Sequence, residues 1–487
     1  MNIAKNIFKN TVALFVARAG YMLGSIILVF VLSRMLRAEG LGSYSTAMAL
    51  FGLAELACEL GLSNFIPREL AKDLVQTNRY LIHASALVVV GGLGSAAVLV
   101  GLAPHLGYSS ETVASLYLIA PALFPTTLRV VMGAIFIAHQ RVEFEAFATL
   151  FWTILRILIS LYLLSLGYGV ISLIAVFTVT SYLAWLNSIF FYVRFIDKPR
   201  WEFDWTFLRS MILDLRIFIV LALAGSVFVQ AETVILSLVQ GEIQVGFYAA
   251  AYKLVMVWYL IPQSFMGVVF PVLTRAYQES SHRAELIQDK SIKYLLCLAM
   301  PLSIGGFVVA DATINLFYGT GFEESILVFR VMAWHVALAF VNNVLWRILL
   351  ASDQQHLALR VQVASGIIRV VLSLAFTSWW GALGAALALM GGYSVYTLMH
   401  VYYIQQQGVQ IPFVRLGGRF TLAAVMMGVI LFFLTPHMHL FVLVFLGMII
   451  YGIGVILLGA FSKEDVALLR QIWGPGLKEP ADPTNHV

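Results

Sequence analysis

Charged side chains are scarce in this sequence. Asp, Glu, Lys and Arg together make up 11% of the 487 residues, whereas a soluble domain carries about 25%. Hydrophobic residues account for 61% of the chain, and the mean hydropathy is +0.90. A soluble fold of this length has no core large enough to bury so much apolar surface. The composition therefore predicts an all-α polytopic membrane protein.

Other absences exclude several classes of function. The chain has two cysteines, Cys58 and Cys297, each in an apolar segment, so we expect neither a disulfide framework nor a cysteine metal site. No Gly-x-x-x-x-Gly-Lys-[Ser/Thr] phosphate loop occurs, which excludes an ATPase motor of that kind within the chain. The basic residues are scattered rather than gathered in one patch, which argues against nucleic acid as a partner. We expect no cofactor, no metal and no catalytic residue.

Long apolar runs fill most of the chain. A helix needs about 20 mostly apolar residues to cross the hydrocarbon core of a bilayer. By this criterion we predict about 14 transmembrane helices. They lie near residues 11–33, 43–66, 81–103, 112–138, 146–166, 169–193, 217–239, 246–273, 294–314, 326–350, 359–377, 381–404, 417–435 and 439–461.

The loop charges predict how the chain sits in the membrane. With these spans, the segments on the side of the N-terminus hold 21 Lys and Arg residues, and those on the other side hold 2. The positive-inside rule then places both termini of this multi-pass protein in the cytoplasm. The loops on the outer side are short, so they leave no room for an extramembrane catalytic domain. We therefore do not expect an enzyme.

The sequence contains an internal repeat. A shift of 204 residues places residues 41–47 on residues 245–251, which share a Gly-x-Tyr-x-x-Ala core, and places Pro67 on Pro271. The two copies are six spans apart and therefore share one orientation, which predicts two six-helix lobes in a parallel pseudo-repeat plus a C-terminal helix hairpin. The predicted divisions are an N-terminal lobe, an interfacial cytoplasmic linker, a C-terminal lobe, two additional helices and a cytoplasmic tail, at residues 1–195, 196–216, 217–405, 415–461 and 462–487.

Basic side chains occur inside the predicted spans. A charged side chain at the centre of a bilayer costs at least roughly 2.5 kcal/mol, so such residues usually face a polar cavity or a partner. Only three carboxylates, Glu55, Glu59 and Glu232, lie at similar depth. The resulting excess of positive charge predicts an anionic ligand. The seven basic residues are Arg18, Arg129, Arg156, Lys253, Arg330, Arg347 and Arg369.

Depth in the span separates the expected roles of these cations. Arg18 lies about two turns from the cytoplasmic end, so it either binds substrate or extends to the inner surface. Arg330 is near Glu323 and Glu324 at an outer helix end, where we expect a structural ion pair, and Arg347 is expected to reach the cytoplasmic surface. Deeper residues are expected to face a cavity or to pair between helices. We assign substrate binding to Arg18, Arg129, Arg156, Lys253 and Arg369.

The three carboxylates have two open interpretations. Glu55 and Glu59 are four residues apart and therefore share one helix face. They either pair with a cation such as Arg18 or take up protons or sodium. Glu232 either pairs with Lys253 or serves as the coupling carboxylate.

Several short segments resemble a known family. In the first half they are residues 40–47 (Gly-Leu-Gly-Ser-Tyr-Ser-Thr-Ala), 59–63 (Glu-Leu-Gly-Leu-Ser) and 67–69 (Pro-Arg-Glu). In the second half they are residues 246–254 and 270–273 (Phe-Pro-Val-Leu). In their order and spacing these segments resemble the Wzx-like polysaccharide flippases of the multidrug/oligosaccharidyl-lipid/polysaccharide exporter superfamily. Members commonly carry Asp at the position of Glu59, a change that keeps the charge.

The resemblance implies a V-shaped, two-lobed transporter. It would move an isoprenoid (undecaprenyl)-pyrophosphate-linked oligosaccharide across the inner membrane by alternating access, for O-antigen or exopolysaccharide biosynthesis. The partners would be the lipid-linked substrate, membrane lipids and a glycan polymerase with its chain-length machinery. The aromatic residues Tyr21, Trp152 and Trp346 are candidates to stack against the sugars.

Two alternatives stay open at this point. An ion-coupled multidrug or metabolite antiporter of the same superfamily would share the fold, but it should have a more acidic or neutral cavity. A membrane glycan polymerase usually has a substantial outer loop, and the outer loops here are short and nearly uncharged. The excess of arginines favours the flippase.

Overall fold

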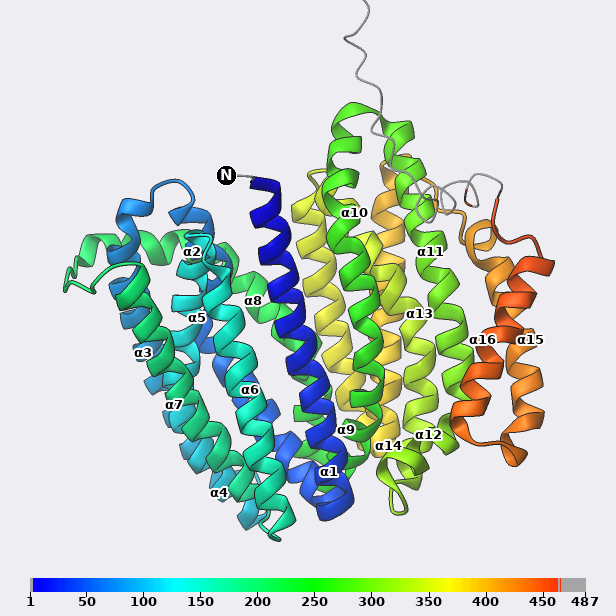
Figure 1. The fold of residues 1–487 in the computed structure, drawn as a ribbon, viewed down its shortest axis with the longest axis horizontal. Helices are drawn as coiled ribbons and strands as arrows, with labels where there is room; N and C mark the ends of the chain where they lie inside the picture. Colours follow the sequence, from blue (N-terminus) through cyan, green and yellow to red (C-terminus); the bar gives the residue numbers. More distant parts are fainter. Residues whose placement is uncertain (1–2, 463–464, 466–487) are drawn as a thin grey trace, which may run out of the picture.

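The computed structural model describes residues 3–462 and residue 465. Within this range it describes all side chains except those of residues 3–19, 21, 217, 221, 223, 224 and 226–228. The described residues form helices joined by short turns, and they include no strand (Figure 1). The α-helices are α1 (Ile3–Glu59), α2 (Leu62–Leu70), α3 (Thr77–Leu102), α4 (Ser110–Ile119), α5 (Leu123–Ala138), α6 (Val142–Ser165), α7 (Val170–Phe195), α8 (Trp205–Gln240), α9 (Glu242–Met256), α10 (Leu260–Glu279), α11 (Ser281–Val308), α12 (Ala310–Tyr318), α13 (Glu323–Ala351), α14 (Gln355–Gln406), α15 (Phe413–Leu434) and α16 (Leu440–Leu457).

Two helices are long because each contains two spans. The backbone of α1 leaves helical geometry at Arg37, and that of α14 does so at Gly381. Ten segments of the described chain are long and apolar enough to cross a membrane, and α14 is one of them. Counting α14 as two spans, and adding two from α1 and one from α8, gives the predicted fourteen.

The spans form two lobes and an outer hairpin. Helices α1–α7, the N-lobe, supply six spans, and helices α8–α14, the C-lobe, supply six more. Figure 1 shows α2–α7 on one side, α10–α14 on the other, and α15 and α16 at the outer edge of the C-lobe. The lobes approach each other where the second half of α1 lies beside α9. The predicted all-α fold with a C-terminal hairpin is thereby confirmed.

The backbone repeats at the offset read from the sequence. Arg37 (φ 58°) precedes the second half of α1, and Gly241 (φ 83°), 204 residues later, precedes α9. A methyl group on Gly42 would overlap the carbonyl oxygen of Glu242, and one on Gly246 would overlap that of Ala38. Ala38 and Glu242 are also 204 residues apart. A contact in which each copy uses the same positions is two-fold symmetric, so the pseudo-two-fold axis passes between Gly42 and Gly246.

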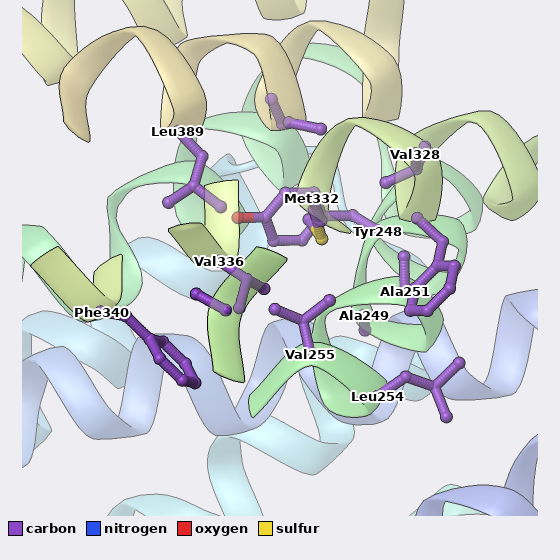
Figure 2. Packing of buried hydrophobic residues seen from close by; sticks show 14 of the residues in the cluster. Tyr248, Ala249, Ala251, Leu254, Val255, Val328, Met332, Val336, Phe340 and Leu389 are labelled. Carbon is purple, nitrogen blue, oxygen red and sulfur yellow. The ribbon is translucent and has the colours of Figure 1, made fainter. Parts of the chain in front are cut away.

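The largest buried cluster lies mainly in the C-lobe and extends to residues of α1, α6 and α7 in the N-lobe. Figure 2 shows Tyr248 and Val255 of α9 packed against Met332 and Val336 of α13 and Leu389 of α14. Lipid tails are as apolar as these side chains, so helices in a membrane associate through close packing rather than through the hydrophobic effect. This packing gives the C-lobe helices fixed positions from which polar side chains reach its interior.

The segment before α8 is anchored on the N-lobe. The Asn78 side chain of α3 donates to the carbonyl of Arg200 (2.8 Å) and accepts from its amide (2.9 Å). Asp204 caps α8 by accepting from the amide of Thr206 (2.9 Å). The hydrogen bonds to its carboxylate, first of all the one from the Thr206 hydroxyl, lower the pKa of Asp204 to about 2. Helix α8 therefore begins at Trp205, inside the segment 196–216 that we predicted as a linker. The exposed Trp201 and Trp205 have the character of membrane-interface residues.

Candidate functional site

A tight turn brings Arg129 of α5 to a carboxylate of α6. The two helices are joined by residues 139–141, so they form an antiparallel hairpin. Arg129 Nη1 donates to Glu145 Oε1 (2.6 Å) and to Thr149 Oγ1 (3.2 Å), and the Thr149 hydroxyl donates to the same Glu145 oxygen (3.1 Å). Both charged side chains are partly buried. Glu145 was assigned to a loop from the sequence and was missed as the partner of Arg129.

Two more charges complete this group. Glu55 of α1 hydrogen-bonds the Thr126 side chain and lies within electrostatic reach of Arg129 and Arg156. The Arg156 guanidinium of α6 lies over the Phe177 ring of α7, 4.9 Å from its centroid. We call Glu55, Arg129, Glu145 and Arg156 the N-lobe charge cluster. Its two arginines are balanced by two carboxylates, and Glu59, one turn along α1, also lies within electrostatic reach of Glu55. The cluster therefore presents oriented donors with little net charge.

The C-lobe contains a fully buried ion pair. Arg369 of α14 donates to Glu232 of α8 through both Nε and Nη2, with 2.6 Å between Nη2 and Oε2. The two side chains are 1% and 2% exposed. The guanidinium also lies over the ring of Tyr393, 5.4 Å from its centroid. The expected partner of Glu232 was Lys253, and that pairing is wrong, because the structure pairs Glu232 with Arg369.

Lys253 of α9 has no counter-charge among the described residues. It lies within the second repeat motif and is half-buried. No carboxylate of the described residues lies within 4.0 Å of its Nζ atom, whereas Arg129, Arg330 and Arg369 each have one. Arg18 belongs to α1, but its side chain is outside those that the structure describes.

Two further cations lie outside these groups. Arg330 forms the structural ion pair that we expected, but its partner is Asp311 rather than Glu323 or Glu324, because α12 packs beside α13. Arg347 does not simply extend to the surface. It lines a cavity of about 290 Å³ and donates through Nη1 to the backbone carbonyl (3.0 Å) and the side-chain oxygen of Asn343.

This cavity lies between the start of α10, α13 and α14. Its polar lining residues include Gln263, Asn342, Asn343, Gln362 and Arg347, beside the aromatic Trp346. Of the three aromatic residues expected to stack against sugars, Trp346 alone is found here, while Trp152 lies on α6 and the side chain of Tyr21 is outside the described part of the chain. The amides were missed because single Asn and Gln residues in apolar helices give no signal of a shared cavity.

The two lobes are tied together at the end remote from the N-terminus. Glu242, at the first turn of α9, accepts from the Ser43 hydroxyl (2.9 Å), the Ser109 hydroxyl (2.8 Å) and the Ser109 amide (3.0 Å). Nearby, the Tyr108 and Ser237 hydroxyls are 2.8 Å apart. We call these five residues the distal latch. It joins α1 and the segment before α4 to α8 and α9, so it holds this end of the molecule closed.

The described residues include no group of three or more His, Cys, Asp or Glu side chains arranged to hold a metal ion. The arrangement instead offers hydrogen-bond donors and cations at separate places in the two lobes. The chemistry that it supports is reversible binding of a polar, anionic molecule.

Comparisons with known proteins agree with this description. The profile of the family described as "Polysaccharide biosynthesis protein" matches residues 31–327. A probable low-salt glycan biosynthesis flippase, Agl15 of Haloferax volcanii, is 23% identical over 250 residues, or 50% of this chain and 53% of the relative. The match therefore spans about half the length of that relative.

Solved structures share the whole fold. The lipid II flippase MurJ in an inward closed conformation has a TM-score of 0.77 at 14% identity, and the alignment covers 96% of this chain and 99% of MurJ. A multidrug resistance MATE transporter of the MOP superfamily in an inward-facing conformation has a TM-score of 0.68 at 15% identity, with 80% and 94% of the two chains covered. At such identities the likeness shows the fold alone, and it confirms the predicted membrane architecture.

Proposed function

Because this chain belongs to the polysaccharide biosynthesis protein family, we propose that it is a flippase for a lipid-linked oligosaccharide. Its substrate is an isoprenoid-pyrophosphate carrier, such as undecaprenyl pyrophosphate, that bears the sugars. It moves the headgroup from the cytoplasmic to the outer leaflet of the inner membrane, and both of its termini are cytoplasmic. The product serves O-antigen or exopolysaccharide biosynthesis, where a polymerase and its chain-length machinery take it over.

Lys253 is the observation that carries the proposal. Lys253 is half-buried, and no carboxylate in the described part of the chain lies near it. Inside a membrane protein such a cation calls for an anionic ligand. A pyrophosphate headgroup loses its water when it enters the membrane, and fixed donors must replace that water. Lys supplies a compact charge, while Arg129 and Arg156 of the N-lobe charge cluster supply planar guanidinium groups that suit phosphate. Phosphate oxygens compete with Glu145 and Glu55 for the same donors.

The distal latch supports alternating access. With this end of the molecule closed, the substrate enters from the side of the N-terminus. Release on the other side requires the Glu242 hydrogen bonds to Ser43 and Ser109 to break while the two lobes, near residues 1–195 and 217–405, rock against each other. An antiporter for cationic drugs is less well supported, because Lys253 repels such a cargo.

Lipid co-purification tests the proposal. The full chain is extracted gently, and bound lipids are identified by mass spectrometry for the wild type and for K253Q, R129Q and R156Q. We expect the wild type to retain an isoprenoid-pyrophosphate oligosaccharide. Each variant should retain about tenfold less, because a charge-assisted hydrogen bond contributes about 1.5–3 kcal/mol.

The matched control is R283Q, which removes an exposed arginine paired with Glu279 four residues away. It should retain as much of the lipid as the wild type. Recovery of ordinary phospholipids alone from the wild type would argue against a flippase. If K253Q and the wild type retain equal amounts of the lipid-linked oligosaccharide, Lys253 is not part of the binding site.

A further inference from the structure

The C-lobe cavity has the composition of a binding site rather than of a packing defect. Four of its lining side chains are amides, Gln263, Asn342, Asn343 and Gln362, and each amide offers one acceptor and two donors. Its volume of about 290 Å³ lies near the lower end of the range for ligand pockets, about 300–1,000 Å³. The cavity therefore suits a small polar segment of a larger molecule.

Asn342 provides an independent sign of a ligand. Its side chain is 3% exposed, and its Nδ2 donates to the Thr397 hydroxyl (2.7 Å) and to the Tyr393 carbonyl (3.4 Å). Its Oδ1 atom is buried and has no hydrogen-bond partner among the described residues. A buried acceptor left without a donor costs about 1–3 kcal/mol. A hydroxyl group in the cavity would satisfy it.

Trp346 adds an aromatic surface to the amides. It lines the cavity four residues after Asn342, one helical turn along α13. The His400 ring stands perpendicular to it, with 6.4 Å between the ring centroids, and helps to hold it in place. A sugar ring has an apolar face of C–H groups and a rim of hydroxyls. An aromatic side chain beside several amides matches both features.

The charge of the lining residues restricts the class of sugar that the cavity can bind. Arg347 is the charged side chain that lines the cavity, and its contact with Asn343 fixes its direction. The ring of Tyr393, which lines the cavity, contacts Arg369, and the charge of Arg369 is balanced by Glu232. The described residues that line the cavity include no carboxylate, so it accepts neutral or acidic sugars and disfavours free amino sugars.

We propose that this cavity is a saccharide subsite. Trp346 stacks on a sugar ring, and Asn342 accepts from one of its hydroxyls. The inference rests on the proposed function, and it divides the substrate between two places. The pyrophosphate is held by Lys253 and the N-lobe arginines, and the first sugars enter the C-lobe cavity.

Paired probes separate these two parts. The full chain in nanodiscs is titrated with farnesyl diphosphate and with farnesyl diphosphates that carry glucose, galactose or N-acetylglucosamine, and binding is followed by native mass spectrometry. We expect at least one sugar-bearing probe to bind about tenfold more tightly than farnesyl diphosphate, as stacking and a hydrogen bond together would give. In W346L and in N342L the sugar-bearing probe should bind no more tightly than farnesyl diphosphate, so the ratio of the two affinities falls to about one. K253Q should instead weaken the binding of all probes by the same factor.

Two further variants are controls that distinguish a lost sugar contact from misfolding. W346F keeps an aromatic face and should keep most of the ratio, and W380L changes an exposed tryptophan of α14 that does not line the cavity, so it should keep all of it. An unchanged ratio in W346L and N342L would overturn the subsite alone. The same holds if no sugar-bearing probe binds better than farnesyl diphosphate. If none of the probes binds the wild type, the proposed function fails, and the subsite fails with it.

Discussion

Arg369 shows how strongly one contact changes the interpretation of a residue. From the sequence it was a candidate to bind substrate, and that role stays a prediction. In the structure its Nε and Nη2 atoms both donate to the Glu232 carboxylate, and the pair joins α14 to α8. Gly392 leaves room for the stem of Arg369, since a methyl group there would lie 2.8–3.0 Å from its side-chain carbons. These contacts favour a structural role.

Single and double substitutions separate the two roles. Leaving one partner of a buried pair alone is strongly destabilising, so we expect E232L and R369L each to lower the free energy of unfolding by about 3–5 kcal/mol. The double variant E232L/R369L should regain most of that loss, because it buries no unpaired charge. Thermal unfolding of the purified variants measures this. If R369L is as stable as the wild type but loses lipid binding, Arg369 belongs to the substrate site instead.

At the scale of helices, two glycines set the approach of the repeats. The second half of α1 and α9 begin at Arg37 and Gly241, both with positive φ, and they cross at Gly42 and Gly246. Small residues let membrane helices approach closely. This explains why the Gly-x-Tyr-x-x-Ala core is the part of the repeat that is easiest to see in the sequence.

The symmetry of this crossing can be tested. G42A and G246A each place a methyl group against a backbone carbonyl of the other repeat, so we expect each to destabilise the protein by a similar amount, about 1–3 kcal/mol. Thermal unfolding measures both. The controls are G94A and G267A, where an added methyl meets no atom within 4 Å. Since Ala is favoured over Gly in a helix, these controls should be neutral or stabilising. A large effect of one variant and none of the other would contradict a symmetric contact.

For the molecule as a whole, the distal latch decides which side is closed. Glu242 belongs to the C-lobe, and two of its partners, Ser43 and Ser109, belong to the N-lobe. A single carboxylate therefore joins elements from both lobes, which agrees with a molecule that opens by separating them.

Removal of this carboxylate should favour the distally open state. In E242A, Ser43 and Ser109 lose their acceptor, and each charge-assisted hydrogen bond contributes about 1.5–3 kcal/mol, so opening should increase about tenfold or more. Hydrogen–deuterium exchange of residues 105–112 and 238–246 should rise accordingly. The control is E39Q, which changes an exposed carboxylate two residues after the kink of α1 at Arg37. It should leave the exchange of these residues unchanged. Unchanged exchange in E242A would mean that the glycine contact alone holds the lobes together.

The number of spans, the repeat and the superfamily followed from the sequence. Each span is specified locally by about 20 apolar residues, and the repeat motif keeps its glycine and proline at one offset. The partners of the buried charges did not follow in the same way. Glu145 and Arg129, Asp311 and Arg330, and Glu232 and Arg369 meet only because of how each helix is rotated and which helix lies beside it. Packing of the folded chain sets both, so only the tertiary structure determined these pairs, the amide-lined cavity and the distal latch.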